Sequence, residues 1–140
     1  MMKRLVFNDP KTVLLVDAMI PGEKFSPNLP SIGLLENGKL VGGVVYNQYT
    51  GNGIAMHVAG LRKGWITRRF IRAAFEFPFV YLGCARVTGL VRTDNPVALD
   101  FDKRLGFVEE GVIRKGDDDG CDLILLGMLK EECRWIRKGE

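Results

Sequence analysis

The spacing of apolar residues divides the first half of the chain into one helix and a series of strands. Lys11–Ile20 carries apolar residues at helical spacing and predicts a helix. Ser31–Glu36, Lys39–Thr50 and Ile54–Gly60 are rich in β-branched and aromatic residues, and Asn37-Gly38 is a strong hairpin signal between the first two. These three segments predict an antiparallel meander.

Helical and strand patterns alternate in the second half of the chain. Trp65–Phe77 has an apolar stripe at helical spacing. The remaining predicted elements are a strand at Arg86–Arg92, a helix opening at Asn95, strands at Phe107–Arg114 and Asp122–Leu129, and a short helix in the last eleven residues. A meander followed by this alternation predicts an α+β domain with one central sheet. With 140 residues the chain is expected to form a single domain over 1–140.

Composition excludes several functional classes. A net charge of +3 is too small to indicate a nucleic-acid partner, which usually requires a clear basic stripe. The three cysteines lack any C-x-x-C spacing, and with a single histidine they argue against a zinc site or a disulfide framework. We expect no metal. No segment is apolar and long enough for a signal peptide or a membrane span, so we expect a cytoplasmic protein without membrane contact.

The predicted helix after Arg86–Arg92 has clear signals at both ends. Asn95 is a good N-cap, Pro96 suits the first helical position, and Gly106 can adopt the left-handed conformation that ends a helix. Structure alone explains each of these residues. Their combined spacing is more informative.

A candidate phosphate site lies at the junction from Gly60 to Arg69. The N–H groups at a helix start carry about half a positive charge, which suits a phosphate. Arg62 and Lys63 lie beside that helix start, and Thr67 adds a hydroxyl. A solvated basic helix face explains the same charges equally well.

His57 is the only histidine and lies midway along the strand before this junction. A lone histidine is more often a packed residue than a catalyst. Its proximity to the candidate phosphate loop adds support for a functional role without making that role the dominant interpretation. Because side chains alternate along a strand, Met56 and Val58 should point to the opposite face.

Together these residues resemble the GNAT superfamily of acetyl-CoA-dependent N-acetyltransferases, whose signature is approximately N-x-x-A-x-x-L-Y-x-K-x-G-F. Asn95, Ala98, Gly106 and Phe107 match it, whereas Phe101, Asp102 and Arg104 replace the Leu, Tyr and Lys. The continuation is similar to the branch of ribosomal-protein and spermidine acetyltransferases, with matches at Glu110, Gly111, Arg114 and Asp122.

The phosphate loop departs from the family pattern R/Q-x-x-G-x-G/A. Only Gly64 is retained, and the bulky Trp65 and Ile66 stand where the family favours close backbone approach. Arg62 and Lys63 offer electrostatic compensation. The loop from Pro21 to Pro30, rich in proline, is expected to cover a site.

The resemblance implies a single mixed, mostly antiparallel sheet flanked by helices, in which Ile54–Gly60 and Arg86–Arg92 splay apart to form an acyl-CoA cleft. Acetyl-CoA is the implied acetyl donor. The implied cofactor-binding residues are Met56, Val58, Arg62, Lys63, Gly64, Trp65, Ile66, Thr67 and Asn95. Tyr46 and Tyr49 are expected to shape the pocket for the acceptor.

The implied reaction is direct attack by a primary amine of a small molecule or protein on the thioester, with His57 as general base. A backbone N–H near Met56–Ala59 would stabilise the oxyanion. Asp102, in the usual tyrosine place, is interpreted as a solvated, ionised helix residue that cannot donate a proton. One alternative is a GNAT-fold protein without catalysis that acts by binding a partner. A nucleic-acid-associated protein is the weaker alternative, and formation of a homodimer stays open.

Overall fold

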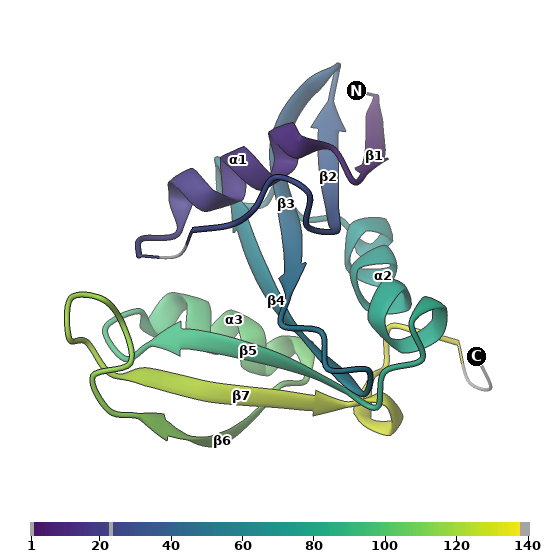
Figure 1. Ribbon diagram of the computed structural model, residues 1–140. Coiled ribbons are helices and arrows are strands. Elements are labelled where there is room, and N and C mark those ends of the chain that lie inside the picture. Colours follow the sequence, from purple (N-terminus) through teal and green to yellow (C-terminus); the bar gives the residue numbers. More distant parts are fainter. Residues whose placement is uncertain (1, 23, 138–140) are drawn as a thin grey trace.

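The computed structural model describes residues 2–22 and 24–137, and these form one seven-stranded sheet with the order β1-β2-β3-β4-β5-β7-β6 (Figure 1). The strands are β1 (Lys3–Phe7), β2 (Ser31–Glu36), β3 (Lys39–Asn47), β4 (Gly53–Gly60), β5 (Arg86–Arg92), β6 (Val108–Ile113) and β7 (Leu123–Leu129). Every neighbouring pair is antiparallel except β4 and β5. The predicted α+β class and mixed sheet are confirmed.

Three α-helices flank this sheet: α1 (Pro10–Met19), α2 (Arg68–Glu76) and α3 (Pro96–Leu105). A π-helical segment (Phe77–Tyr81) continues α2, and a 3-10 turn (Lys130–Glu132) follows β7. The predicted terminal helix is reduced to that turn within the described chain, and residues 138–140 lie outside it. None of the described helices is long and apolar enough to cross a lipid bilayer.

Side-chain caps explain where the helices begin. The Asn95 side chain accepts a hydrogen bond from the Ala98 N–H at 3.2 Å, as its N-cap pattern predicted. Thr67 caps α2 by accepting from the Phe70 N–H at 3.1 Å. Helix α2 therefore begins at Arg68, three residues later than the apolar stripe predicted.

The sheet is covered unequally on its two faces. Val45 packs on one face against Val13 and Val16 of α1. The opposite face holds the larger core, in which residues of β2–β5 and β7 pack against α2 and residues at both ends of α3. Both faces of β3 are therefore buried, although its sequence alone does not show this.

Strands β4 and β5 separate soon after they meet. Their parallel pairing extends over three residue pairs, from Gly53–Arg86 to Ala55–Thr88. Beyond this point, residues 56–60 and 89–92 have no partner on each other's strand within the described chain. Figure 1 shows β4 and β5 diverging from their common end. The predicted splayed strand pair is confirmed.

Candidate active site

A cavity of about 480 Å³ lies where β4 and β5 have separated, on the α1 face of the sheet. Five parts of the chain build its wall. They are the end of α1 with the loop after it, the residue that follows β3, strand β4, strand β5, and the β6–β7 loop together with β7. The lining residues are Ile20, Pro21, Gly22, Gln48, His57, Leu90, Arg92, Gly116, Asp117, Asp118 and Leu123.

His57 is the titratable side chain that β4 contributes to the cavity. It is 8% exposed, and its ring lies 4.9 Å from that of Phe25. Its Nε2 lies 2.8 Å from the Asn47 Oδ1. Because an amide oxygen only accepts, Nε2 carries the proton and Nδ1 keeps its lone pair. Burial lowers the pKa of His57 to about 4, so the ring is neutral at pH 7.

The loop after α1 covers this histidine, in agreement with the expectation that it covers a site. The Asp17 carboxylate accepts from the Phe25 N–H at 2.9 Å, which holds the Phe25 ring over His57. Gly22 of the same loop packs closely against the β6–β7 loop on the opposite wall of the cavity, since a Cβ at Gly22 would lie 2.8 Å from Asp118 Oδ1. The two loops therefore meet at the cavity.

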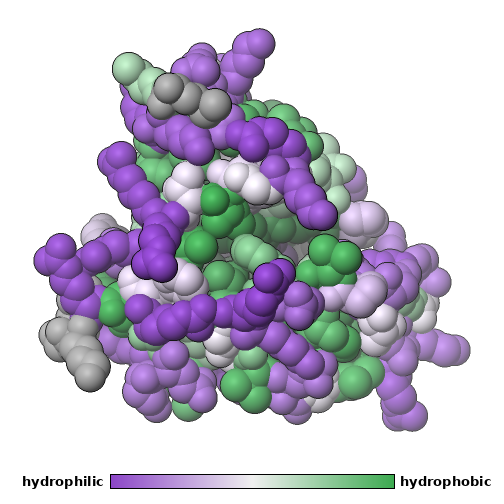
Figure 2. Space-filling view, turned by 180° about the vertical axis from the view of Figure 1, so that it is seen from behind, coloured by the Kyte–Doolittle hydropathy of each residue, from purple (hydrophilic) through white to green (hydrophobic). Residues whose placement is uncertain are grey.

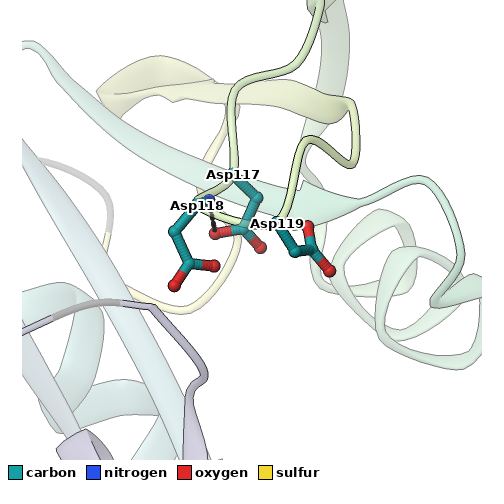
Figure 3. Close-up of side chains that lie close together, drawn as sticks. All are labelled: Asp117, Asp118 and Asp119. Atoms are coloured by element: carbon teal, nitrogen blue, oxygen red, sulfur yellow. Dashed lines mark hydrogen bonds between the residues drawn. The ribbon is translucent and has the colours of Figure 1, made fainter.

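The opposite wall carries a concentration of carboxylates on the β6–β7 loop. One carboxylate oxygen of each of Asp117, Asp118 and Asp119 lies within 4.8 Å of the other two, and Figure 3 shows the three side chains together on this loop. Arg92, at the end of β5, pairs with Asp117 at 2.7 Å and with Asp119 at 2.8 Å, and also reaches Asp94 at 2.9 Å. Among the described residues Asp118 forms no ion pair, so it adds uncompensated negative charge to the wall.

The predicted phosphate loop lies on the other side of the sheet from His57, at the start of α2. Lys63 and Gly64 are exposed, and Gly64 has a left-handed φ of +74°. The Arg62 guanidinium is ion-paired with the nearly buried Glu36, and this hydrogen bond is the main reason that the pKa of Glu36 is lowered. Of the two cations expected at this loop, Arg62 is therefore already paired with a carboxylate, whereas Lys63 forms no ion pair within the described chain.

Trp65 and Tyr46 occupy places different from those expected. The Trp65 indole is buried in the core at 7% exposure, so it offers its side chain to the sheet and not to a ligand. Tyr46 is fully buried, and its hydroxyl donates to the Ala74 carbonyl at 2.6 Å. This corrects the expectation that Tyr46 shapes the acceptor pocket, because the residue points to the α2 face and His57 to the other.

The remaining predicted residues are distributed around the split. Met56 is buried in the α2-side core, Val58 is 38% exposed, and Ile66 is half-buried. Asn95 is exposed at the start of α3. Tyr49 is 53% exposed and follows Gln48, which lines the cavity.

Asp102 differs from its sequence-based interpretation as a solvated, ionised residue. The side chain is half-buried, and burial raises its pKa to about 7. A carboxyl with this pKa is protonated about half the time at neutral pH and can donate a proton. The correction has a simple cause, since sequence spacing did not show that this part of α3 faces the core.

Sequence reasoning missed Arg92, Asp117 and Asp118 as cavity residues. The run KGDDDG between the two last predicted strands has the composition of an acidic turn, which by itself indicates no site. The available signal was the concentration of three carboxylates in one turn, but their approach to Arg92 and Gly22 is a tertiary contact.

Comparison with solved structures identifies the fold. Spermidine/spermine N-acetyltransferase SpeG from Vibrio cholerae, in mutant forms, superposes with a TM-score of 0.74 at 14% identity, covering 93% of this chain and 96% of that one. SpeG in complex with manganese ions gives 0.75 at 14% identity, over 92% and 93%. A probable acetyltransferase gives 0.65 at 24% identity, over 73% of this chain and 61% of that one. No protein-family model and no curated protein matches the sequence. The chain therefore has the fold of the GNAT acetyltransferases.

Proposed function

We propose that the protein is an N-acetyltransferase that transfers an acetyl group from acetyl-CoA to a primary amine. The observation that carries this proposal is the cavity beside the β4–β5 split, which is lined by His57, and the hydrogen bond of this histidine to Asn47 leaves the lone pair of the neutral ring on Nδ1. The fold of the structural neighbours, which include spermidine N-acetyltransferases, supports it.

The two faces of the sheet suggest how the substrates approach. The start of α2 lies on the face opposite the His57 cavity. Seen from behind, this region of the molecule is hollowed, with hydrophobic residues in the hollow and hydrophilic residues around it (Figure 2). Acetyl-CoA would enter from the α2 face, and the acceptor amine would enter from the α1 face. The thioester would then lie in the split, where residues 56–60 have no β5 partner.

The residues available for acetyl-CoA are mostly backbone and small polar groups. The first N–H groups of α2 would receive the pyrophosphate, assisted by Lys63 and by the Thr67 hydroxyl. Asn95, at the start of α3, would line the other side of the split. Residues 56–59 of β4 would supply the N–H that stabilises the oxyanion.

His57 would act on the proton of the amine. An alkylamine with a pKa of about 10.4 is only about 0.04% neutral at pH 7, so deprotonation must be favoured in the site. Nδ1 of His57 would take a proton from the nitrogen through a water molecule as the neutral amine attacks, when the forming C–N bond makes that proton acidic, and would pass it to solvent, because an imidazolium with a pKa of about 4 does not retain it. The amine nitrogen forms the new bond to the acetyl carbon, and the C–S bond breaks. Protonated Asp102 is our candidate donor to the departing thiolate.

The charge of the cavity favours a cationic acceptor. Asp117 and Asp118 line it, and Arg92 compensates Asp117 but not Asp118. An amine with a second positive charge, such as a diamine or a polyamine, would place that charge near Asp118 while its reacting nitrogen lies near His57. Spermidine is the acceptor named for the SpeG neighbours.

Calorimetric titration with acetyl-CoA and CoA, followed by transfer assays with spermidine and simple diamines, tests the proposal. Micromolar binding and acetylation of at least one cationic amine are the expected results. Absence of binding at millimolar acetyl-CoA would reject the enzyme and favour a GNAT-fold binding protein. That second candidate is favoured by one observation, which is that Glu36 already engages Arg62 in the phosphate loop.

Two neighbouring aspartates provide a matched test of the acceptor. Asp118→Asn should raise KM for a diamine about fivefold to tenfold with little change in kcat, because it removes a charge that attracts the substrate. Asp119→Asn is the control, since Asp119 is also exposed but pairs with Arg92 and does not line the cavity. Equal effects of the two substitutions on KM would show that Asp118 does not contact the acceptor.

A further inference from the structure

The sheet contains a hollow that is occupied by one side chain of the phosphate loop. Gly42 of β3 and Gly60 of β4 are directly opposite each other in the register, so two adjacent positions lack side chains on the same face. A Cβ on Gly60 would overlap Nε1 and Cδ1 of Trp65, and a Cβ on Gly42 would lie 2.6 Å from its Cδ2. The indole therefore lies against the bare backbone of both strands.

Trp65 also contacts the helix that follows the loop. Its ring packs edge-on against Phe70, with 4.8 Å between centroids and an interplanar angle of 66°. Phe70 is in the first turn of α2, and its N–H is the group that Thr67 caps. The indole thus joins the sheet to the helix start whose N–H groups face the proposed pyrophosphate site.

The other side chains of the loop are less buried than Trp65, although Arg62 also attaches the loop to the sheet through its ion pair with Glu36. Leu61, Lys63 and Gly64 are exposed, and the chain reverses at Gly64 in the left-handed region immediately before Trp65. Leu61 is held through its N–H, which donates to the Val41 carbonyl at 2.8 Å. Ile66 is only partly buried. Trp65 is therefore the main buried anchor in residues 61–67.

We propose that Trp65 is a positioning residue: its indole, seated on Gly42 and Gly60, holds residues 61–67 in the conformation that receives the acetyl-CoA pyrophosphate. This inference rests on the proposed function. It assigns a role to Trp65, one of the bulky residues by which this loop departs from the GNAT pattern R/Q-x-x-G-x-G/A. The Trp65 indole is buried, so its role is to position the loop and not to contact the ligand.

The expected effect follows from the fraction of molecules with an ordered loop. The apparent Kd equals the intrinsic Kd divided by the competent fraction. If loss of the anchor leaves about one molecule in ten with a correctly placed loop, the Kd for CoA rises about tenfold.

Adjacent glycines on β3 give a matched pair of variants. Gly42→Ala would displace the indole, while every loop residue stays unchanged. Gly43→Ala is the control, because Gly43 faces the other side of the sheet, where a Cβ would contact Thr12 and lie 2.9 Å from the Ile32 carbonyl oxygen. Both substitutions should lower the melting temperature. Only Gly42→Ala should increase the Kd for CoA and accelerate amide hydrogen exchange in residues 61–67.

A second pair of variants keeps the inference testable if the glycine variants do not fold. Trp65→Phe should show the same two changes to a smaller degree. Trp135→Phe is its control, because this second indole packs against the same core while partly buried, and it donates to the Leu105 carbonyl at the end of α3 and not to the loop. Equal loop exchange in Trp65→Phe and Trp135→Phe would overturn the positioning role.

The two readouts separate the inference from the proposed function. If the wild-type protein does not bind CoA, the proposed function fails, and the exchange measured without ligand still decides whether Trp65 orders the loop. If the wild type binds CoA but the Gly42→Ala and Trp65→Phe variants bind it equally well, the positioning inference fails and the proposed function stands.

Discussion

At the scale of single residues, the pair of His57 and Asn47 determines what the site can do. The hydrogen bond from Nε2 fixes the ring orientation and leaves Nδ1 as the acceptor. Burial keeps the ring neutral down to low pH at the expense of its basicity. His57 is thereby suited to orient a water molecule and pass a proton on, and poorly suited to store one.

The pH dependence of the reaction should reveal the low pKa of His57. With a His57 pKa of about 4, kcat/KM should rise with the ionisation of the acceptor amine from about pH 5, without a limb from histidine near 6.5, and should level off above about pH 7 as Asp102 loses the proton it donates. His57→Gln should lower kcat about a hundredfold and leave CoA affinity unchanged. Initial rates and calorimetry measure the two quantities.

Asn47→Ala is the companion variant, because it keeps the imidazole but removes the acceptor for Nε2–H. We expect an intermediate loss of kcat. If His57→Gln retained wild-type kcat from about pH 6 to about pH 9, His57 would have no part in proton transfer.

At the scale of elements, α3 carries two aspartates with different surroundings. Asp100 is exposed and pairs with Arg104 one turn later, whereas Asp102 is half-buried with a pKa raised to about 7. Between the usual value of 3.8 and about 7, the folded state of Asp102 binds more protons than the unfolded chain. Its contribution to the free energy of unfolding is therefore fully present below about pH 4 and is lost as the pH rises through about 7.

Asp102→Asn should consequently stabilise the protein at pH 8 and have little effect at pH 4. The gain at pH 8 is on the order of 3 kcal/mol, which corresponds to several degrees in melting temperature. Thermal unfolding at both pH values measures it, with Asp100→Asn as the exposed control. A pH-independent effect of Asp102→Asn would mean that Asp102 stays ionised and cannot protonate the thiolate.

The sequence predicted elements best where local signals define their ends. Asn95, Pro96 and Gly106 defined α3, and Asn37-Gly38 defined the turn between β2 and β3. The short β1 was missed, because its five residues, KRLVF, carry no turn or repeat signal of their own.

The candidate site was predictable only in part. His57 was found because it is unique, and the split of β4 and β5 followed from the resemblance. The burial of Tyr46 was not predictable, because the period of two along β3 does not show that helices cover both faces. Likewise, the approach of Arg92 to Asp117 and Asp119 joins segments 25 and 27 residues apart, which no local pattern encodes.

At the scale of the whole molecule, the sheet consists of two parts joined by a short connection. Strands β1–β4 and strands β5, β7 and β6 meet through three residue pairs of β4 and β5 and through the core shared with α2 and α3. Beyond this connection, residues 56–60 of β4 and 89–92 of β5 form no β-sheet pairs with each other across the split. They are therefore the backbone groups most open to a bound ligand with amide groups, such as pantetheine.

Acetyl-CoA should bind in the split between β4 and β5 and protect the backbone amides on both sides of it from hydrogen exchange. At a concentration about a hundred times its Kd, it should raise the free energy of unfolding by about 2.7 kcal/mol. Hydrogen exchange should slow in residues 56–60 and 61–67 and, to a lesser degree, in residues 89–92. The amides of 53–55, already beside β5, serve as the internal control. Protection confined to the β6–β7 loop, or a thermal shift without slower exchange in residues 56–67, would mean that the ligand binds elsewhere and that the split is not the acetyl-CoA site.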